Sequence, residues 1–348
     1  MENSFFVFTD KINPVQLERF HICSWEFDNN SSLVEFGFEI SKDSIKDNVL
    51  KISLFIPWVE KSCETKDLYE KLSVPENSRF IFNDSVARTD SLDGGRNKSG
   101  VIHKFSGRNE LCILPAKIEI MDGNLVSAPL NLQHYLNYNR DSKPNIYFRF
   151  WIKPSVPYIS MRKKGISKST IIYDIKVNER RNIPDDKVSY FIDKELCEIK
   201  NCFSFNILPN KYDVVFFDNS SLKNVRTLEY DSFNKYLGDK RVKKDELIVV
   251  FNKKQNSESF SFFSIYSMER IGTGQFALAI LISIICGILL FLPSYRKTFT
   301  PEISLLQVWA KLPFEIYLAL AIAFVLILFF IWPWITNGYA KIKNQYYG

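Results

Sequence analysis

Two long runs without a charged residue, near the end of the chain, constrain this protein more than any other feature. The first run, 276–292, is apolar apart from one serine and lies in the uncharged stretch between Arg270 and Arg296. The second run, 316–335, follows Glu315 and is almost wholly apolar. About 20 apolar residues, rising roughly 1.5 Å each, cross the hydrocarbon core of a bilayer. Both runs therefore predict transmembrane helices, and together they predict a C-terminal hairpin.

The connection between the two runs is short. Thr300, Pro301 and Glu302 have the residue types of a helix N-cap, a first helical position and an early acidic position. A short helix is therefore predicted over 303–309. It either lies on the membrane surface as an interfacial helix or enters the membrane as a re-entrant pore element.

Small residues recur on one face of each run, at the spacing of a helix. They are Ala279, Ser283 and Gly287 in the first run, and Ala319 and Ala323 in the second. Small residues let helices approach closely in lipid, where burial of apolar surface does not drive association. The pattern predicts a homo-oligomer whose subunits meet through this face. The alternative is that the small residues contact only the other helix of the same hairpin.

Residues 1–270 are rich in aromatic and β-branched residues, which predicts a mainly β fold. Segments 34–40 and 146–152 alternate apolar and polar residues, as in antiparallel sheets with one buried and one solvated face. The other predicted strands include 5–9, 49–56, 79–82, 170–177, 203–208, 213–217, 246–251 and 260–266. Helices are predicted only over 66–72 and 232–237. The predicted fold class is an antiparallel sandwich or barrel-like region of one or two units, followed by the helical hairpin.

The proline-bearing segment 153–157 predicts a boundary within the β-rich region. The predicted domains are therefore 1–153, 154–270 and the hairpin, 271–348. Residues 151–270 carry 22 Lys and Arg against 16 Asp and Glu, a net charge of +6, whereas 271–348 carry 5 against 2. The middle of the chain is thus basic, and its last part is nearly uncharged.

The sequence contains no recognisable catalytic or metal-binding motif. The three histidines are far apart, and the five cysteines before the first apolar run lack the spacing of metal ligands. Glu35 and Glu39 are predicted on the solvated face of a strand and not as an acid–base pair. We therefore expect no enzymatic activity, no metal and no cofactor.

The expected location is the bacterial inner membrane, as a multi-pass protein. The chain starts without a basic segment followed by a long apolar one, so no secretory signal is predicted, and the cysteine pattern suits a reducing compartment. The Lys and Arg residues flanking the runs are balanced and do not set the orientation. We expect residues 1–270 and the C-terminal tail in the cytosol, with 296–315 outside. Gly272 and Gly274 are predicted as a hinge before the first run, or alternatively as a plain linker.

A basic cluster is the strongest sequence signal for a ligand. Segment 161–181 carries seven basic and two acidic residues. The residues predicted to bind an anionic ligand or partner are Arg162, Lys163, Lys164, Arg180 and Arg181. Basic side chains pair with phosphates, and aromatic rings stack on bases. Two other interpretations stay open: a solvated face, and attraction to anionic lipid headgroups.

A β-rich part followed by a two-helix membrane hairpin resembles the membrane effectors of bacterial antiviral systems, such as the Hailong-type channel effectors. The resemblance rests on the architecture of 271–348 and not on a motif. It implies a sensing domain that answers a nucleotide second messenger or a partner protein encoded nearby, and an oligomeric pore that depolarises the membrane. The alternatives are a non-conducting, membrane-anchored scaffold, and a tethered enzyme, which the missing motifs disfavour.

Overall fold

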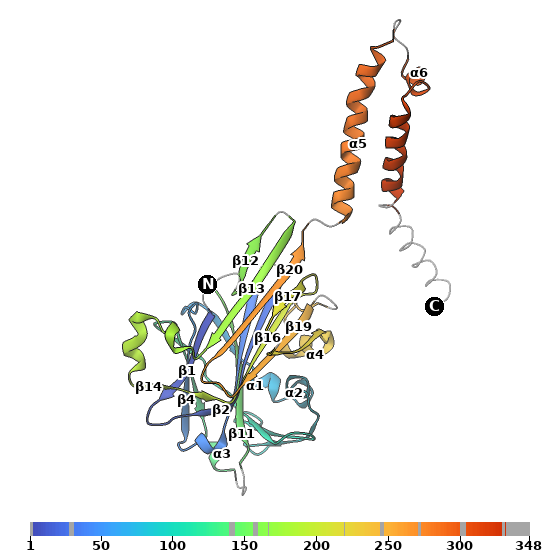
Figure 1. The fold of residues 1–348 in the computed structure, drawn as a ribbon. Helices are drawn as coiled ribbons and strands as arrows, with labels where there is room; N and C mark the ends of the chain where they lie inside the picture. Colours follow the sequence, from blue (N-terminus) through green and yellow to red (C-terminus); the bar gives the residue numbers. More distant parts are fainter. Residues whose placement is uncertain are drawn as a thin grey trace, which may run out of the picture. The chain divides into compact units, whose positions relative to one another are not determined.

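The computed structural model describes residues 3–27, 31–138, 143–155, 159–165, 167–218, 220–243, 247–270, 273–299, 304–328 and 331. The chain forms two compact units. The first, here called the β unit, comprises Met1–Lys164 and Thr170–Met268; the second, the helical unit, comprises Gly165–Ser169 and Glu269–Gly348 (Figure 1).

Two sheets make up the β unit. The first sheet has the strand order β17 (Asp213–Phe217), β20 (Phe260–Glu269), β13 (Lys168–Val177), β1 (Asn3–Asp10), β4 (Val49–Phe55), β10 (Leu125–Asn131) and β9 (Glu119–Met121), with β12 (Met161–Lys164) on β13 and β14 (Lys194–Leu196) on β1. The second sheet has the order β18 (Leu222–Thr227), β19 (Leu247–Gln255), β16 (Asn201–Pro209), β2 (Gln16–Phe27), β3 (Ser31–Ile40), β11 (Asn145–Lys153), β8 (Leu111–Ile113), β7 (Val101–Phe105) and β6 (Val86–Ser91), with β15 (Glu198–Ile199) on β2 and β5 (Glu64–Asp67) on β11.

The main core lies between the two sheets. Because side chains alternate along a strand, each sheet sends every second residue into this core, such as Phe5 from β1 and Phe20 from β2. The opposite side of β1 presents Phe6, which packs against Phe191 at the end of the 3-10 helix η3 (Asp185–Phe191). Three other short helices of the β unit are η1 (Lys42–Ser44), η2 (Arg180–Asn182) and α3 (Gln133–Leu136).

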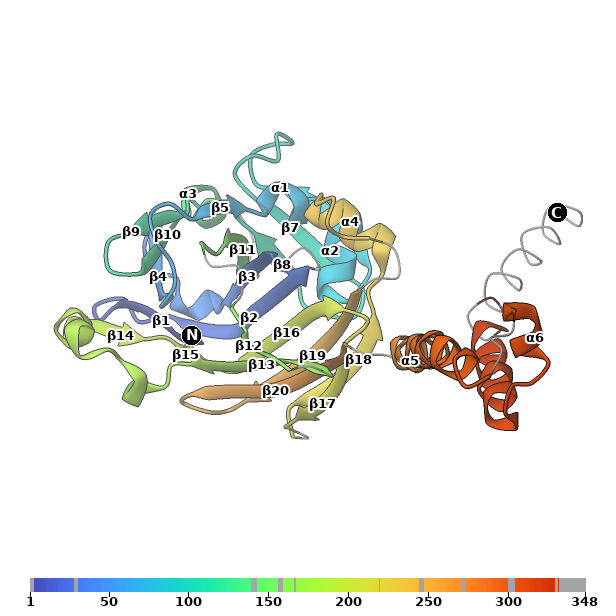
Figure 2. The same ribbon diagram turned by 90° about the horizontal axis from the view of Figure 1, so that it is seen from above.

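Three helices cover part of the outer face of the second sheet. They are α1 (Tyr69–Leu72), α2 (Pro75–Phe82) and α4 (Tyr230–Leu237), and they gather on one side of the β unit in Figure 2. Trp25 of β2 and Tyr236 of α4 belong to the apolar cluster beneath them. The second sheet is therefore buried on both faces where these helices lie.

The fold is mainly β, as predicted, but both sheets are mixed. β1 runs parallel to β13, and β2 runs parallel to β16, so in each sheet strands from residues 3–153 lie edge to edge with strands from residues 161–269. The predicted boundary at residue 153 falls inside the β unit. Strands on both sides of this position therefore belong to one compact unit, and β11 ends at Lys153 within it.

The predicted solvated face of 34–40 is wrong, because β3 is buried on both faces. Glu35 is fully buried and Glu39 is 6% exposed. The alternating sequence places Glu35 and Glu39 on one face of the strand. Helices cover this face, and arginines pair with its carboxylates, so the face is buried although it carries charged residues. An alternating pattern therefore indicated a strand without indicating how far it is buried.

Segment 79–82 is helical and not a strand. It ends α2, which has Pro75 in its first turn and Asn83 at its C-terminal cap with φ 52°, in the left-handed region that asparagine tolerates. A short apolar run of this length fits a strand and a buried helix equally well. Segment 66–72, predicted as a helix, begins as the end of β5 and becomes helical only in α1.

The helical unit contains one helix long and apolar enough to cross a membrane, among the residues described. This helix, α5 (Thr273–Arg296), has 24 residues and includes the whole first predicted run. The second predicted run is described only in part, as the apolar helix Phe314–Leu328, which is shorter than a membrane span. Residues 329–330 and 332–335 lie outside the described residues.

Between these helices lies the short helix α6 (Leu305–Trp309). Its N-cap is Ser304, whose backbone and side chain exchange hydrogen bonds with those of Gln307 in a capping box. A helix is therefore present where 303–309 predicted one. The predicted cap residues Thr300 to Glu302 lie outside the described residues.

Candidate ligand-binding cavity

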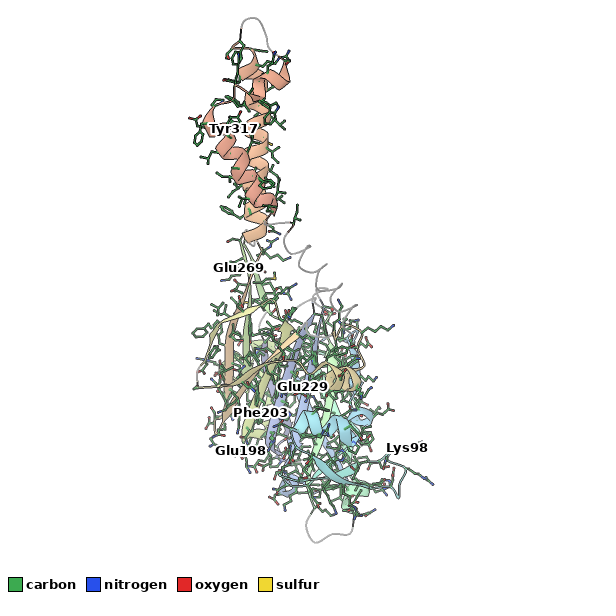
Figure 3. All side chains as sticks on the ribbon, turned by 90° about the vertical axis from the view of Figure 1, so that its right-hand side faces the viewer. Lys98, Glu198, Phe203, Glu229, Glu269 and Tyr317 are labelled. Atoms are coloured by element: carbon green, nitrogen blue, oxygen red, sulfur yellow. The ribbon has the colours of Figure 1, made fainter. Side chains whose placement is uncertain are left out.

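A cavity of about 330 Å³ opens on the outer face of the second sheet. Strands β2, β16, β18 and β19 supply most of its lining. The end of α2, the middle of α4 and Arg149 of β11 supply the rest. The lining combines aromatic and cationic side chains. Figure 3 labels two residues of this region, Phe203 on β16 and Glu229, which directly precedes α4.

One wall of the cavity is a row of parallel phenylalanine rings. Phe205 and Phe251 are paired across β16 and β19, with ring centroids 4.7 Å apart and planes 1° apart. The Phe203 ring lies 5.8 Å from the Phe251 ring, with 15° between their planes. Phe80 from α2 and Phe233 from α4 also line the cavity. Alternate residues on adjacent strands share one face, and this is why phenylalanines two apart in sequence form the row.

Cationic side chains line the cavity, and no carboxylate does so among the described residues. Lys223 and Arg226 come from β18, and Arg19 comes from β2. The Arg226 side chain is 44% exposed and lies 3.2 Å from Glu229, which is itself outside the lining. The lining itself is therefore cationic, while the carboxylates that pair with Arg226 and Arg19 lie outside it.

His21 contributes a neutral polar group to the cavity lining. Burial, reinforced by the charges of Arg149, Arg19 and Arg108, lowers the pKa of His21 well below its usual value. Its Nδ1 lies 3.0 Å from the Tyr147 hydroxyl. A neutral imidazole can donate one hydrogen bond and accept another, so His21 offers this cavity a polar contact without charge.

Beneath the cavity, a buried ion pair joins β3 and β11. The Arg149 guanidinium contacts Glu35 Oε2 through Nε at 2.6 Å and Nη2 at 2.5 Å. Trp25 Nε1 donates to Glu35 Oε1 at 2.8 Å, and the Tyr236 hydroxyl donates to Oε2 at 2.9 Å. Burial opposes the charge of Arg149, but the Glu35 carboxylate keeps the pKa of Arg149 well above its usual value. The network ties α4, which bears Phe233, to the sheet.

A second buried carboxylate supports the rim. Glu39 accepts from Arg108 Nη2 at 3.0 Å and lies 3.3 Å from Arg19 Nε. The Arg108 guanidinium also stacks on Phe82 of α2, with 5.0 Å between the guanidinium carbon and the ring centroid. Glu39 thus pairs with Arg19 at the cavity, where the Arg19 side chain is 38% exposed.

The structure does not bring the predicted basic residues together. Arg162 Nη2 lies 2.5 Å from Glu26 Oε2, and Glu26 is fully buried. Lys163 and Lys164 are exposed at the end of β12, whereas Arg180 and Arg181 are exposed in η2, beyond the far end of β13. The seven residue steps from Thr170 to Val177 alone span about 23 Å, at roughly 3.3 Å each. A single small ligand cannot contact both groups.

The small residues of the two apolar runs differ in exposure. Ala279, Ser283 and Gly287 of α5 are exposed, and no heavy atom lies within 4 Å of a Cβ added to Gly287. Ala319 is half-buried and Ala323 is buried.

The predicted hinge is described only in part. Gly274 belongs to the first turn of α5, while Gly272 lies outside the described residues. Within the described part of the chain, no group of three or more His, Cys, Asp or Glu side chains could hold a metal ion.

Sequence reasoning missed the cavity residues, although two signals were present. Phe203 and Phe205 are two apart, which places both rings on one face of a strand. Arg149 interrupts an otherwise apolar strand, and a lone charge in such a strand needs a buried partner. Neither signal identified Lys223 or Arg226, since these reach the cavity only through the pairing of β18 with β19.

Comparison with known protein families and with curated proteins found no match for this chain. The fold and the cavity define a class: a mainly β protein with an aromatic, cationic cavity and a C-terminal helical part that contains one candidate membrane span.

Proposed function

We propose that this protein is a membrane effector in which the ligand-binding β unit controls a membrane-embedded helical unit. The exposed apolar surface of α5 carries this proposal. Phe276, Leu289 and Leu290 are 65%, 63% and 77% exposed, and a helix that is apolar all round belongs in lipid. The 24 residues of α5 extend about 36 Å, enough to cross the hydrocarbon core.

In this proposal the helical unit is a multi-pass hairpin in the bacterial inner membrane, with the β unit in the cytosol. Helices α5 and Phe314–Leu328 belong to the two predicted spans. Two helices cannot enclose a lumen, so several copies assemble into a pore, and the exposed face with Ala279, Ser283 and Gly287 supports such assembly. Opening of this pore would depolarise the cell, which is an outcome suited to antiviral defence.

The pore would not be lined by a ring of charges. Between residues 273 and 292 α5 contains no ionisable group other than Cys286, and ionisable residues usually mark ion pathways in membranes. A wide or hydrophobic pore that opens by wetting fits this composition.

The test is membrane potential in cells that express the full chain. Wild type should sediment with membranes and depolarise the cells. The double variant Ile282→Arg with Ile285→Arg places two charges in the middle of α5, at about 3 kcal/mol each, and should lose both properties. Ile12→Arg with Ile192→Arg is the matched control, since both isoleucines are exposed in the β unit.

A non-conducting membrane scaffold is the alternative. It predicts that wild type sediments with membranes without depolarising cells or releasing ions from liposomes. Membrane integration without any conductance would therefore reject the pore-forming function and support the scaffold function.

A further inference from the structure

The cavity on the second sheet points to a particular ligand chemistry. We propose that it binds an anion carrying one planar aromatic ring, of the size of a single nucleotide, with the ring inside and the anionic group at the rim. This inference rests on the proposed function, in which the β unit senses a ligand, and it names the ligand class of that site.

The ring is placed by the phenylalanine wall. Phe203, Phe251 and Phe205 have nearly parallel planes, separated by 15° and 1° for the two neighbouring pairs. Phe80 of α2 and Phe233 of α4 also line the cavity, so both the sheet and the helices that cover it supply aromatic groups. Because these rings are stacked on one another, they meet a planar base mainly through edge-to-face contacts, which any base can make because each has a π-face.

The anionic group is placed by the cations. Lys223 and Arg226 are exposed on β18, and Arg19 of β2 pairs with Glu39 of β3. The described lining contains no carboxylate, and Glu229 and Glu39, which pair with Arg226 and Arg19, lie outside it. Arginine and lysine at the rim supply charge-assisted hydrogen bonds to phosphate oxygens, while the ring remains among the phenylalanines.

The polar groups inside the cavity favour a ring with hydrogen-bonding edges over a fatty acyl chain. His21 is neutral, and Asn83 and Asn224 also line the cavity. A nucleobase can hydrogen-bond with these groups, two of which, Asn83 and Asn224, are exposed, whereas a hydrocarbon chain cannot. The volume of about 330 Å³ lies at the lower end of the range for small-molecule sites, which fits one nucleotide.

The experiment measures binding by calorimetry on the full chain in mild detergent. The probes are AMP, UMP, adenosine, inorganic phosphate and dodecanoate. We expect at least one of the two nucleotides to bind at least tenfold more tightly than adenosine or phosphate. Lys223→Gln with Arg226→Gln should weaken that binding at least tenfold and reduce its salt dependence. Phe251→Leu should weaken the nucleotide and the nucleoside alike.

The matched control is Arg180→Gln with Arg181→Gln, which removes two exposed cations elsewhere on the β unit and should leave binding unchanged. Absence of nucleotide binding would overturn the assignment. So would equal affinity for phosphate alone, preference for dodecanoate, or equal loss in the control variant. If Phe251→Leu fails to fold, the variant Lys223→Gln with Arg226→Gln still tests whether the cavity binds the nucleotide, because both residues are exposed.

The two proposals fail separately. Nucleotide binding without depolarisation by the wild type would retain this ligand assignment and remove the pore. Depolarisation without nucleotide binding would retain the pore and remove this ligand assignment.

Discussion

Glu35 and Arg149 show how one buried ion pair organises the helix-covered face of the sheet. The carboxylate is fully buried and accepts hydrogen bonds from Arg149, Trp25 and Tyr236, so four elements meet at one group. Removing one partner of such a pair leaves an uncompensated charge, whereas replacing both with apolar residues is much less costly. The pair consequently affects stability most strongly when it is broken on one side.

A double-mutant cycle tests this interaction. We expect Arg149→Met and Glu35→Leu each to lower the free energy of unfolding by about 3–5 kcal/mol. Glu35→Leu should cost more, because it also leaves the Trp25 and Tyr236 donors unpaired. The double variant should cost clearly less than the sum of the two. Urea denaturation of the full chain in detergent, followed by tryptophan fluorescence, gives these values, and simple additivity would contradict the coupling.

At the scale of single elements, α5 exposes most of its apolar side chains. Leu281 is buried, and Ala279, Ser283 and Gly287 form an exposed stripe. Since a Cβ at Gly287 would meet no heavy atom within 4 Å, larger residues fit there without a clash in this chain. The stripe is therefore available to another copy of the chain, which is the arrangement that the proposed pore requires.

Ser283→Leu with Gly287→Leu tests the role of this stripe. We expect the double variant to dissociate the oligomer in detergent while keeping its helix content, because bulky side chains keep neighbouring helices apart. Light scattering coupled to size exclusion measures the mass. Ile282→Leu with Ile285→Leu is the control and should leave the mass unchanged. An oligomer of unchanged mass in the Ser283 and Gly287 variant would assign the contact to another face.

At the scale of the whole molecule, the two units impose different requirements on their surroundings. The β unit buries a mixed double sheet, and its five cysteines are buried. The helical unit instead exposes large apolar side chains along α5. The proposed topology places the β unit in the cytosol and residues 296–315 outside.

Single cysteines test this topology. In a Cys286→Ala background the remaining cysteines are buried and react slowly, so an introduced cysteine reports its own side. Lys297→Cys should react with a membrane-impermeant maleimide in intact spheroplasts. Lys98→Cys, in an exposed loop, should react only after lysis. The opposite labelling pattern would reverse the orientation.

Some features of this protein followed from the sequence alone. The apolar run 276–292 predicted the long helix α5, and the aromatic and β-branched alternation predicted a mainly β region, because both signals are local. Only the tertiary structure decided that Glu35 is buried, that β13 separates Lys164 from Arg180, and that the two halves of the chain share one double sheet. The cavity also arises at this level, since its walls come from strands and helices between Arg19 and Phe251. Which strands become neighbours depends on the pairing of distant segments, and no local pattern specifies that pairing.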